Sequence, residues 1–277
     1  MASLISLCTL KPWKTHLLKH ILTIPRVIKL PHLKLKVDFS GWRIPILIPV
    51  KYFESALLNI EHVFVNCDYF QVDYAIPAPG YSVLDIGGFL GFYSSATSRL
   101  TGKSGVVYVF EPNPLVLSYL ARNAEISTTS GARVRVYPRA VCVEGGVVEL
   151  YVGENPAVSS LLAEHVELFT KINRRVQVKC TRLSSVLRHL RYVDIVKLDV
   201  EGLELDLLRE ASDELNRVRV LVVEVHRDLV ETSEVEELLI NHGFRDIVVY
   251  TSSEMPYQVI LYAKRTLSSM RGYRDPC

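Results

Sequence analysis

From Ser82 onward, short apolar runs alternate with amphipathic segments, and this alternation limits the folds that the chain can adopt. The runs IVKLDV and VLVVEV are apolar at most positions, as strands are when helices cover both faces of their sheet. Such strands, joined by helices, form a mostly parallel sheet. The predicted strands cover residues 82–87, 105–111, 133–141, 147–152, 176–180, 194–200, 219–225, 244–250 and 257–264. The predicted helices cover residues 92–100, 114–126, 184–190, 203–215 and 233–242.

The last two strand-like runs are joined by the short polar segment TSSEMP, which suits an antiparallel hairpin. Among doubly wound sheets, this addition favours the methyltransferase variant over the dinucleotide-binding variant. We therefore predict an α/β fold with a doubly wound, mostly parallel seven-stranded sheet and a C-terminal antiparallel hairpin. This is the Rossmann-like class I methyltransferase fold.

The first part of the chain lacks this alternation. Prolines interrupt it at positions 12, 25, 31, 45 and 49, and residues 1–37 contain seven basic side chains and no acidic one. Because the net charge of the whole chain is only +2, a basic arm precedes a mildly acidic body. We predict a basic N-terminal extension over residues 1–55, a methyltransferase domain over 56–265 and a short tail over 266–277.

The segment WKTHLLKHILTI in this extension predicts an amphipathic helix, with Trp13, Leu17 and Ile21 on one side. We favour a lid on the main domain or a contact in a homo-dimer for this helix. The alternative is a helix that lies on an anionic membrane surface. Nucleic acid is not the expected partner, because the aromatic side chains are not interleaved with the lysines.

The cysteines suggest a reducing compartment. There are five of them, an odd number, with no CxxC pair and no histidine at ligand spacing, so we expect reduced, structural thiols. The opening MASLISLCTL has neither a preceding charge nor a cleavage site, and IPILIPV is short and broken by prolines. We therefore expect a cytoplasmic protein, associated with membranes only through its basic arm.

A glycine-rich turn follows the strand predicted at 82–87. The stretch VLDIGGFLG places Asp85 directly before Gly87, Gly88 and Gly91, at the edge of the sheet where doubly wound folds bind ligands. A carboxylate beside a pyrophosphate would cost about 1 to 4 kcal/mol in repulsion. S-adenosylmethionine carries an ammonium, a sulfonium and no phosphate, so the turn favours this ligand. The alternative is that Asp85 only caps the turn and the glycines only permit close packing.

The next strand ends in VFEPNP. Glu111 stands where nucleoside-binding sheets place an acid that accepts hydrogen bonds from ribose hydroxyls. Asn113, followed by Pro114, is a second candidate for cofactor binding, and its alternative role is the N-cap of a helix. Ala140 and Val141 are candidates to line an adenine pocket, although plain strand core would look the same.

Taken together, these motifs resemble the FkbM-type S-adenosylmethionine-dependent methyltransferases over about residues 60–250. The resemblance rests on VFVNCDY, VLDIGGFLG, VFEPNP, the RAV segment and IVKLDVEGLE, in that order and at compatible spacing. It implies methyl transfer from S-adenosylmethionine to a hydroxyl of a small-molecule or glycan acceptor, such as a sugar or lipid-linked glycan. Phe89 departs from the family, which more often has a polar residue such as Asn there. The alternatives are a non-catalytic nucleoside-binding scaffold protein and, disfavoured by Asp85 and the hairpin, a NAD-dependent oxidoreductase.

Ionisable residues gather near the ends of two predicted strands. Lys197, Asp199 and Glu201 alternate with apolar residues, so we expect them on one side of their strand. Asp199 is the first candidate for a general base, kept ionised by Lys197 and crowded by Glu201; the alternative is a structural ion pair with Lys197. Glu224 and His226 are a second candidate pair at the same rim, unless His226 is a solvated residue after the strand.

Two further predictions concern metal and the loop after residue 153. The acidic residues show no defined ligand spacing, so we predict no metal site. Within NPAVSSLL, Ser159 and Ser160 are weaker candidates for contacts to cofactor or acceptor. Simple turn residues are the favoured alternative for both.

Overall fold

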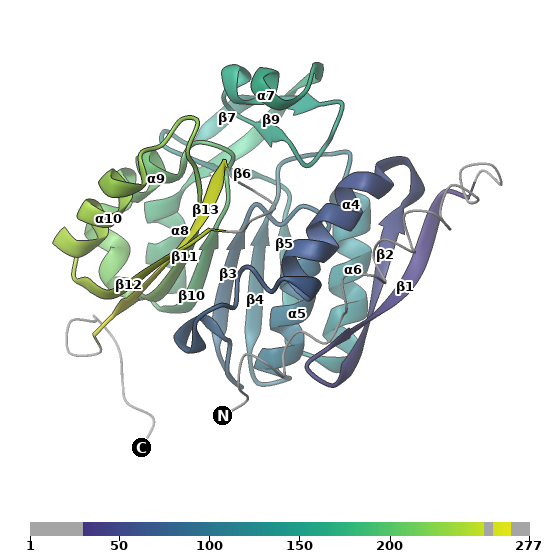
Figure 1. Ribbon diagram of the computed structural model, residues 1–277, viewed down its shortest axis with the longest axis horizontal. Helices are drawn as coiled ribbons and strands as arrows, with labels where there is room; N and C mark the ends of the chain where they lie inside the picture. Colours follow the sequence, from purple (N-terminus) through teal and green to yellow (C-terminus); the bar gives the residue numbers. More distant parts are fainter. Residues whose placement is uncertain (1–29, 252–256, 267–277) are drawn as a thin grey trace.

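The computed structural model describes residues 30–251 and 257–266 and has the predicted α/β architecture (Figure 1). Its main sheet has seven strands in the order β12-β13-β11-β10-β3-β4-β5. The strands are β3 (Ser82–Ile86), β4 (Val106–Phe110), β5 (Arg133–Tyr137), β10 (Val193–Leu198), β11 (Val218–His226), β12 (Phe244–Tyr250) and β13 (Gln258–Arg265). Five of these strands, β3, β4, β5, β10 and β11, are parallel. Strand β13 pairs antiparallel with both β11 and β12. The predicted fold class and C-terminal hairpin are confirmed.

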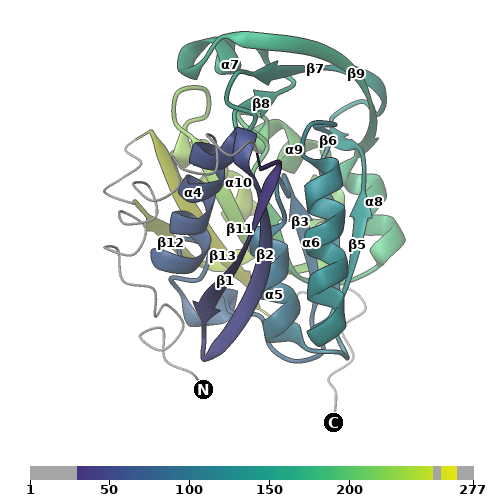
Figure 2. The same ribbon diagram turned by 90° about the vertical axis from the view of Figure 1, so that its right-hand side faces the viewer.

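Helices cover both faces of this sheet (Figures 1 and 2). One face carries α4 (Phe53–Ile60), α5 (Phe92–Thr101) and α6 (Leu117–Ser130), and the other carries α8 (Leu183–Leu190), α9 (Glu204–Glu210) and α10 (Thr232–Asn241). Successive strand residues point to opposite faces, so Val83 packs in the core under the first set of helices and Leu84 in the core under the second. Burial on both faces explains why these strands are apolar at nearly every position.

The helix boundaries differ from prediction in two places. The helix expected from Pro114 begins at Leu117, because Val116 N–H first closes a turn on the carbonyl oxygen of Asn113. The helix expected over 203–215 consists of α9 followed by the 3-10 segment η4 (Ser212–Arg217). Three other short helical segments are η1 (Val50–Tyr52), η2 (Glu61–Val65) and η3 (Asp73–Ala75).

The single strand predicted over 133–141 is wrong. The chain forms β5 and then β6 (Ala140–Cys142), which belong to different sheets. Pro138 between them has no N–H to donate to a sheet, and Arg139 N–H turns back to the carbonyl oxygen of Tyr137. This break allows the chain to leave the main sheet.

A second sheet of four strands, in the order β6-β9-β7-β8, follows from that break. Its other strands are β7 (Gly146–Gly153), β8 (Ser159–Ser160) and β9 (Ile172–Arg182), and α7 (Ala163–Phe169) connects β8 to β9. The sheet lies over one end of the main sheet, at the top of Figure 1. Its contacts with the loops after β4 and β10 show that this end is the carboxyl edge.

A hairpin of β1 (His32–Phe39) and β2 (Trp42–Pro49) lies within the segment predicted as the N-terminal extension. The amide of buried Asn123 in α6 donates to the carbonyl oxygen of Leu47 and accepts from its N–H, at 3.1 and 2.7 Å. Apolar residues of the hairpin, such as Phe39 and Ile46, belong to the core that α5 and α6 also share. This part of the extension is therefore packed on the main domain.

The amphipathic helix predicted over 13–24 lies outside the described residues, as does most of the TSSEMP connection. The lid, dimer-contact and membrane-surface interpretations therefore stay predictions. Within residues 30–251 and 257–266, no helix combines the length and the apolar character needed to cross a membrane.

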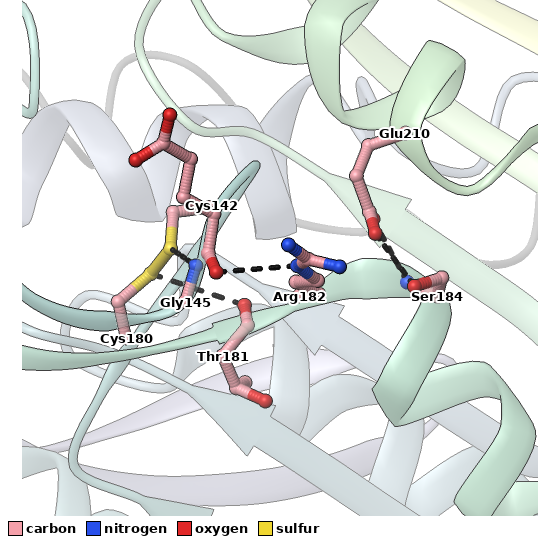
Figure 3. Close-up of a disulfide and its surroundings, with 8 residues drawn as sticks. Cys142, Gly145, Cys180, Thr181, Arg182, Ser184 and Glu210 are labelled. Carbon is pink, nitrogen blue, oxygen red and sulfur yellow. Dashed lines mark hydrogen bonds between the residues drawn. A yellow bond between two sulfur atoms is a disulfide. The ribbon is translucent and has the colours of Figure 1, made fainter.

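A disulfide joins Cys142 of β6 to Cys180 of β9 (Figure 3). The two strands are parallel neighbours, and the Cα atoms of the two cysteines lie 6.0 Å apart. The prediction that all cysteines are reduced is therefore wrong for this pair. The sequence did not reveal the disulfide, because two cysteines 38 positions apart form no recognisable spacing motif. Reduced thiols were one reason to expect a cytoplasmic protein, and the disulfide removes this reason.

Candidate active site

A cavity opens at the carboxyl ends of β3, β4 and β10. Its walls are the loops that follow these strands, together with parts of β6, β7 and β8 from the second sheet. Of the residues predicted for the site, Gly87, Glu111, Ala140, Val141 and Asp199 line the cavity. This is the edge of the sheet where doubly wound folds bind their ligands.

The ionisable side chains that line the cavity are all acidic. They are Glu111, Asp199 and Glu201, and no lysine, arginine or histidine lines it in the described part of the chain. These carboxyl groups favour a positively charged ligand group over a phosphate.

Gly87 and Gly88 stand where two strand ends approach each other closely. Gly87 has a φ of 82°, and a Cβ there would lie 1.8 Å from the carbonyl oxygen of Asp199. A Cβ on Gly88 would lie 2.2 Å from Cγ1 of Val109. Both positions require glycine for close packing. Gly91, which begins α5, does not line the cavity.

Asp85 lies beneath this turn and does not line the cavity. Its carboxylate is fully buried, accepts a hydrogen bond from Ser94 Oγ and lies 3.6 Å from Nζ of Lys197. Burial raises the pKa of Asp85 above its ordinary value, although Lys197 and Ser94 oppose this shift. Asp85 therefore does not contact a ligand in the cavity directly, and its charge would act on such a ligand only through the glycine turn.

Glu111 is buried and held in place by the backbone. Its two carboxylate oxygens accept the N–H groups of Phe89 and Asn113 at 2.8 and 2.7 Å. Burial raises the pKa of Glu111 to about 7, although these two hydrogen bonds lower it. Each oxygen keeps a lone pair for a further donor from the cavity.

Asn113 supports the loop and does not line the cavity. Its Oδ1 accepts the N–H of Leu115, and its Nδ2 donates to Ser159 Oγ and to the carbonyl oxygen of Pro156. The side chain therefore caps the turn before α6 and ties it to the second sheet.

Phe89 has a φ of 44°, in the left-handed region that a bulky residue rarely adopts. Asn, the residue more often found there in the resembling family, adopts this conformation readily. In this chain the Phe89 N–H donates to Glu111, and the residue is one of those that line the cavity. The aromatic side chain therefore brings an apolar surface where the family more often has a polar one.

Lys197 and Asp199 form the predicted pair at the end of β10. Nζ of Lys197 lies 2.9 Å from Oδ2 of Asp199 and donates to the carbonyl oxygen of Gly87 at 2.8 Å. Burial lowers the pKa of Lys197, but Asp199 and Asp85 outweigh burial and raise the pKa above its ordinary value. The ammonium thus stays charged behind Asp199, which faces the cavity.

Glu224 lies in β11 behind this pair, as predicted, but it does not line the cavity. It accepts a hydrogen bond from the hydroxyl of Tyr69, a buried residue whose ring stacks under Nζ of Lys197 at 5.1 Å. Burial and the nearby charge of Asp199 together raise the pKa of Glu224 to about 7. Tyr69 belongs to the VFVNCDY motif, so that motif supports the acidic end of the cavity.

Glu201 does not continue the row of Lys197 and Asp199, and that prediction is wrong. β10 ends at Leu198, and Glu201 has a φ of 56°. Its Oε2 lies 2.6 Å from Nε2 of His165 and 3.3 Å from Nε2 of His226. The end of the strand breaks the alternation that would have kept Glu201 on the same side as Asp199.

His226 has no exposed surface, so its interpretation as a solvated residue is wrong. Its Nδ1 lies 2.8 Å from Oε1 of Glu204. Burial lowers the pKa of His226, but Glu204 and Glu201 outweigh it and raise the pKa well above the ordinary value. The imidazole is therefore part of a buried charge network beside the cavity.

Sequence reasoning missed several members of this network. They are Tyr69, His165, Glu204 and Asp228. His165 lies 36 residues from Glu201, in the helix of the second sheet, and no local pattern connects them. Glu204, in contrast, ends the recognised IVKLDVEGLE motif and could have been considered. Ser159 and Ser160 line the cavity, and Ser160 Oγ donates to the carbonyl oxygen of Glu201 at 2.7 Å.

The chain is similar to several known proteins. The family described as the methyltransferase FkbM domain matches residues 85–245. Methyltransferase 1 of Beauveria bassiana is 28% identical over 231 residues, which cover 76% of this chain and 88% of that protein. Methyltransferase sdnD of Sordaria araneosa is 27% identical over 220 residues, which cover 68% of this chain and 84% of that protein. A solved SAM-dependent O-methyltransferase from Thermotoga maritima aligns with a TM-score of 0.46 and 14% identity, over 88% of this chain and 81% of that chain.

The family match spans more than half of the chain and contains the glycine turn, the strand that ends at Glu111 and the KLDVEG segment. It also contains the acidic residues that line the cavity. The chain belongs to the FkbM methyltransferase family.

Proposed function

We propose that this methyltransferase takes its methyl group from S-adenosylmethionine and transfers it to a hydroxyl of a sugar, glycan or lipid-linked glycan. The observation that carries the cofactor assignment is the uniformly acidic ionisable lining of the cavity, Glu111, Asp199 and Glu201. A pyrophosphate would be repelled by this lining, whereas a ligand with an ammonium and a sulfonium would be attracted.

The residues of the cavity fit the parts of this cofactor. Glu111, held by two backbone N–H groups, is suited to accept hydrogen bonds from both ribose hydroxyls. Ala140, Val141 and Leu150 form an apolar wall that suits a flat adenine ring. Gly87 also lines the cavity and lets its backbone pack closely against that of Asp199, on the side where the methionine end would lie.

The chain supplies positioning and a proton acceptor. When bound, S-adenosylmethionine contributes a methyl group on a sulfonium leaving group. A hydroxyl acceptor loses its proton as it gains the methyl group, and Asp199 is a carboxylate that faces the cavity and can take this proton. Lys197 holds Asp199 in one orientation, which favours the aligned geometry of the transfer. Glu224 and His226 are second candidates that would act from behind Asp199.

The acceptor class rests on the resemblance to FkbM-type enzymes, which act on hydroxyls of glycans and natural products. Oxygen is the expected acceptor atom because carboxylates near the site can take the proton that a hydroxyl must lose. A contact with anionic membranes through the basic arm would bring the protein to lipid-linked acceptors. This contact and a homo-dimer both stay predictions.

Calorimetry tests the cofactor. The full-length protein is titrated with S-adenosylmethionine, with its demethylated product and with NAD. We expect both methionine-derived ligands to bind and NAD to give no heat. Binding of NAD without a response to S-adenosylmethionine would contradict the proposal and would favour an oxidoreductase.

Mass spectrometry tests the transfer. Glycan and lipid extracts are incubated with the protein and methyl-labelled S-adenosylmethionine, and products heavier by one labelled methyl group are sought. Asp199→Asn should slow transfer by about 10²- to 10⁴-fold. The control is Asp246→Asn, which changes an exposed carboxylate on β12 and should leave transfer unchanged. Cofactor binding with no labelled product in any extract would favour the non-catalytic scaffold.

A further inference from the structure

Two histidines and a glutamate meet beside the cavity. His165, Glu201 and His226, the His-Glu-His cluster, each bring one ligand atom to within 4.8 Å of the others. His165 comes from α7, Glu201 from the loop after β10 and His226 from the end of β11. Three separate segments of the chain therefore converge on one point, and Glu201 connects that point to the cavity.

Each imidazole of the cluster is oriented by a second carboxylate. Nδ1 of His165 lies 2.9 Å from Oδ2 of Asp228, and Nδ1 of His226 lies 2.8 Å from Oε1 of Glu204. Both carboxylates engage the ring nitrogen that points away from Glu201, so both Nε2 atoms point toward it. This carboxylate–imidazole arrangement is the one that orients histidine ligands in protein metal sites.

One nitrogen of the cluster lacks a hydrogen-bond partner. Nε2 of His226 is buried and makes no hydrogen bond among the described residues, and it lies 3.3 Å from Oε2 of Glu201. The His226 side chain has no exposed surface, so water does not replace the partner at the protein surface. A cation between Nε2 and the Glu201 carboxylate would engage both atoms, and a buried polar atom without a hydrogen bond destabilises the fold.

The backbone of Glu201 is held in an unfavourable conformation that points its carboxylate at the two histidines. Its φ of 56° lies in the left-handed region, and Ser160 Oγ donates to its carbonyl oxygen at 2.7 Å. Glu204 accepts the N–H of Gly202 at 3.0 Å and also binds His226. Such strain in a well-supported loop is typical of functional sites.

We propose that His165, Glu201 and His226 bind one divalent transition-metal ion, with Zn²⁺ as the best fit. Two imidazoles and one carboxylate form a ligand set that Zn²⁺ uses in catalytic sites, where a further position stays open. At bond lengths of about 2.1 Å, tetrahedral ligand atoms lie about 3.4 Å apart. The 3.3 Å separation of His226 and Glu201 already matches this, and the 2.6 Å separation of His165 and Glu201 must widen slightly.

Other ions and another ligand set fit less well. Mg²⁺ and Ca²⁺ prefer oxygen ligands, whereas two of the three ligands here are nitrogens. Asp199, Glu224 and His226 also come within 4.8 Å of one another. In that set, however, Asp199 already pairs with Lys197, and Glu224 already accepts the hydroxyl of Tyr69. A cation there would lie beside the Lys197 ammonium.

The open position of such an ion would face the cavity, because Glu201 lines it. An acceptor hydroxyl bound there would be polarised and would lose its proton more easily. This role rests on the proposed methyl transfer. The proposed binding of zinc does not depend on methyl transfer, so an experiment can contradict one proposal and leave the other standing.

Metal analysis of the full-length protein tests the site. The protein is dialysed against a chelator, reloaded with Zn²⁺ or Co²⁺ and freed of unbound metal before measurement. We expect one equivalent of zinc by elemental analysis. We also expect a visible Co²⁺ spectrum of nitrogen and oxygen ligands, without the near-ultraviolet band that thiolates give. Zinc should raise the thermal unfolding temperature of the chelator-treated protein, and Mg²⁺ should not.

Variants assign the ion to the cluster. His165→Ala and Glu201→Gln should each weaken zinc binding at least about 10-fold, and Asp228→Asn should weaken it about 10- to 100-fold through the orientation of His165. The matched control is His189→Ala, an exposed histidine of α8, which should bind zinc like the unchanged protein. Circular dichroism checks that each variant is folded, and Glu201→Gln preserves side-chain size if His165→Ala does not fold.

Three results would overturn the proposal. They are zinc retained at no more than trace occupancy after reloading, equal zinc affinity in Glu201→Gln and the unchanged protein, and a thiolate band in the Co²⁺ spectrum. The last two would assign the metal to surface histidines or to cysteines. None of these measurements uses S-adenosylmethionine or an acceptor, so they are independent of methyl transfer.

Discussion

Nζ of Lys197 lies 2.9 Å from Oδ2 of Asp199, and both groups stand at the carboxyl edge of the sheet. The same ammonium lies 3.6 Å from Asp85 and donates to the carbonyl oxygen of Gly87. One buried cation therefore interacts with two carboxylates and joins the end of β10 to the glycine turn after β3. The site depends on this residue although it does not line the cavity.

Lys197→Met should lower the free energy of unfolding by about 3–5 kcal/mol at pH 7, because it leaves Asp85 buried without its cation. Urea denaturation measures this change. The control is Lys264→Met, whose partner Asp246 is exposed and 3.7 Å away, and which should cost at most about 1 kcal/mol. If both variants lost the same free energy of unfolding, burial would not make the ion pairs of Lys197 more important for stability than the exposed pair of Lys264.

Gly87→Ala should abolish binding of S-adenosylmethionine and lower the free energy of unfolding by about 3 kcal/mol or more, because its Cβ would collide with the backbone of Asp199. Gly41→Ala is the matched control. Gly41 also has a positive φ, of 78°, but no atom lies within 4 Å of a Cβ there, so it should cost only about 1–2 kcal/mol. Calorimetry and thermal unfolding measure the two effects. Retained cofactor binding in Gly87→Ala would contradict the close approach of the two strand ends.

The affinity for S-adenosylmethionine should fall as the pH drops below about 7. Burial raises the pKa of Glu111 to about 7 in the free protein. Ribose hydroxyls donate to the ionised carboxylate, so below this pKa the ligand must displace a proton. The dissociation constant should rise up to about tenfold per pH unit below 7 and level off above about pH 8.

Two variants check that Glu111 is the group that titrates. Glu111→Gln should remove most of this pH dependence and weaken binding at pH 8 by about 1.5–3 kcal/mol. Glu224 also has a pKa raised to about 7 by burial, but it does not line the cavity, so Glu224→Gln should keep the pH dependence. A pH dependence lost in Glu224→Gln and kept in Glu111→Gln would reverse the assignment.

Cys142→Ser should lower the free energy of unfolding by about 4 kcal/mol under non-reducing conditions, because the disulfide closes a loop of 38 residues in the unfolded chain. Under strong reduction the unchanged protein and the variant should have the same stability. Mass spectrometry of the unreduced, alkylated protein should find Cys142 and Cys180 linked. Alkylation of both residues without reduction would show that the pair does not form in solution.

The fold was predictable because its signals are local. Strands buried on both faces, such as the run VLVVEV, are recognisable from consecutive apolar residues, and their order along the chain restricts the topology. The same reasoning placed Glu111 and Asp199 at one edge of the sheet, since parallel strands end together. The prediction of one strand over 133–141 was wrong because Pro138 ends β5, and the sheet that β6 then joins depends on contacts distant in the sequence.

The doubly wound sheet, its hairpin and the acidic edge near the glycine turn follow from residue order alone, because periodicity and parallel connections act over short distances. Three features emerge only from the three-dimensional packing: the burial of Asp85 beneath the turn, the contact of Cys142 with Cys180 and the contact of His165 with Glu201. These contacts depend on how the second sheet folds over the first, and that packing is a sum of many weak apolar contacts spread along the chain.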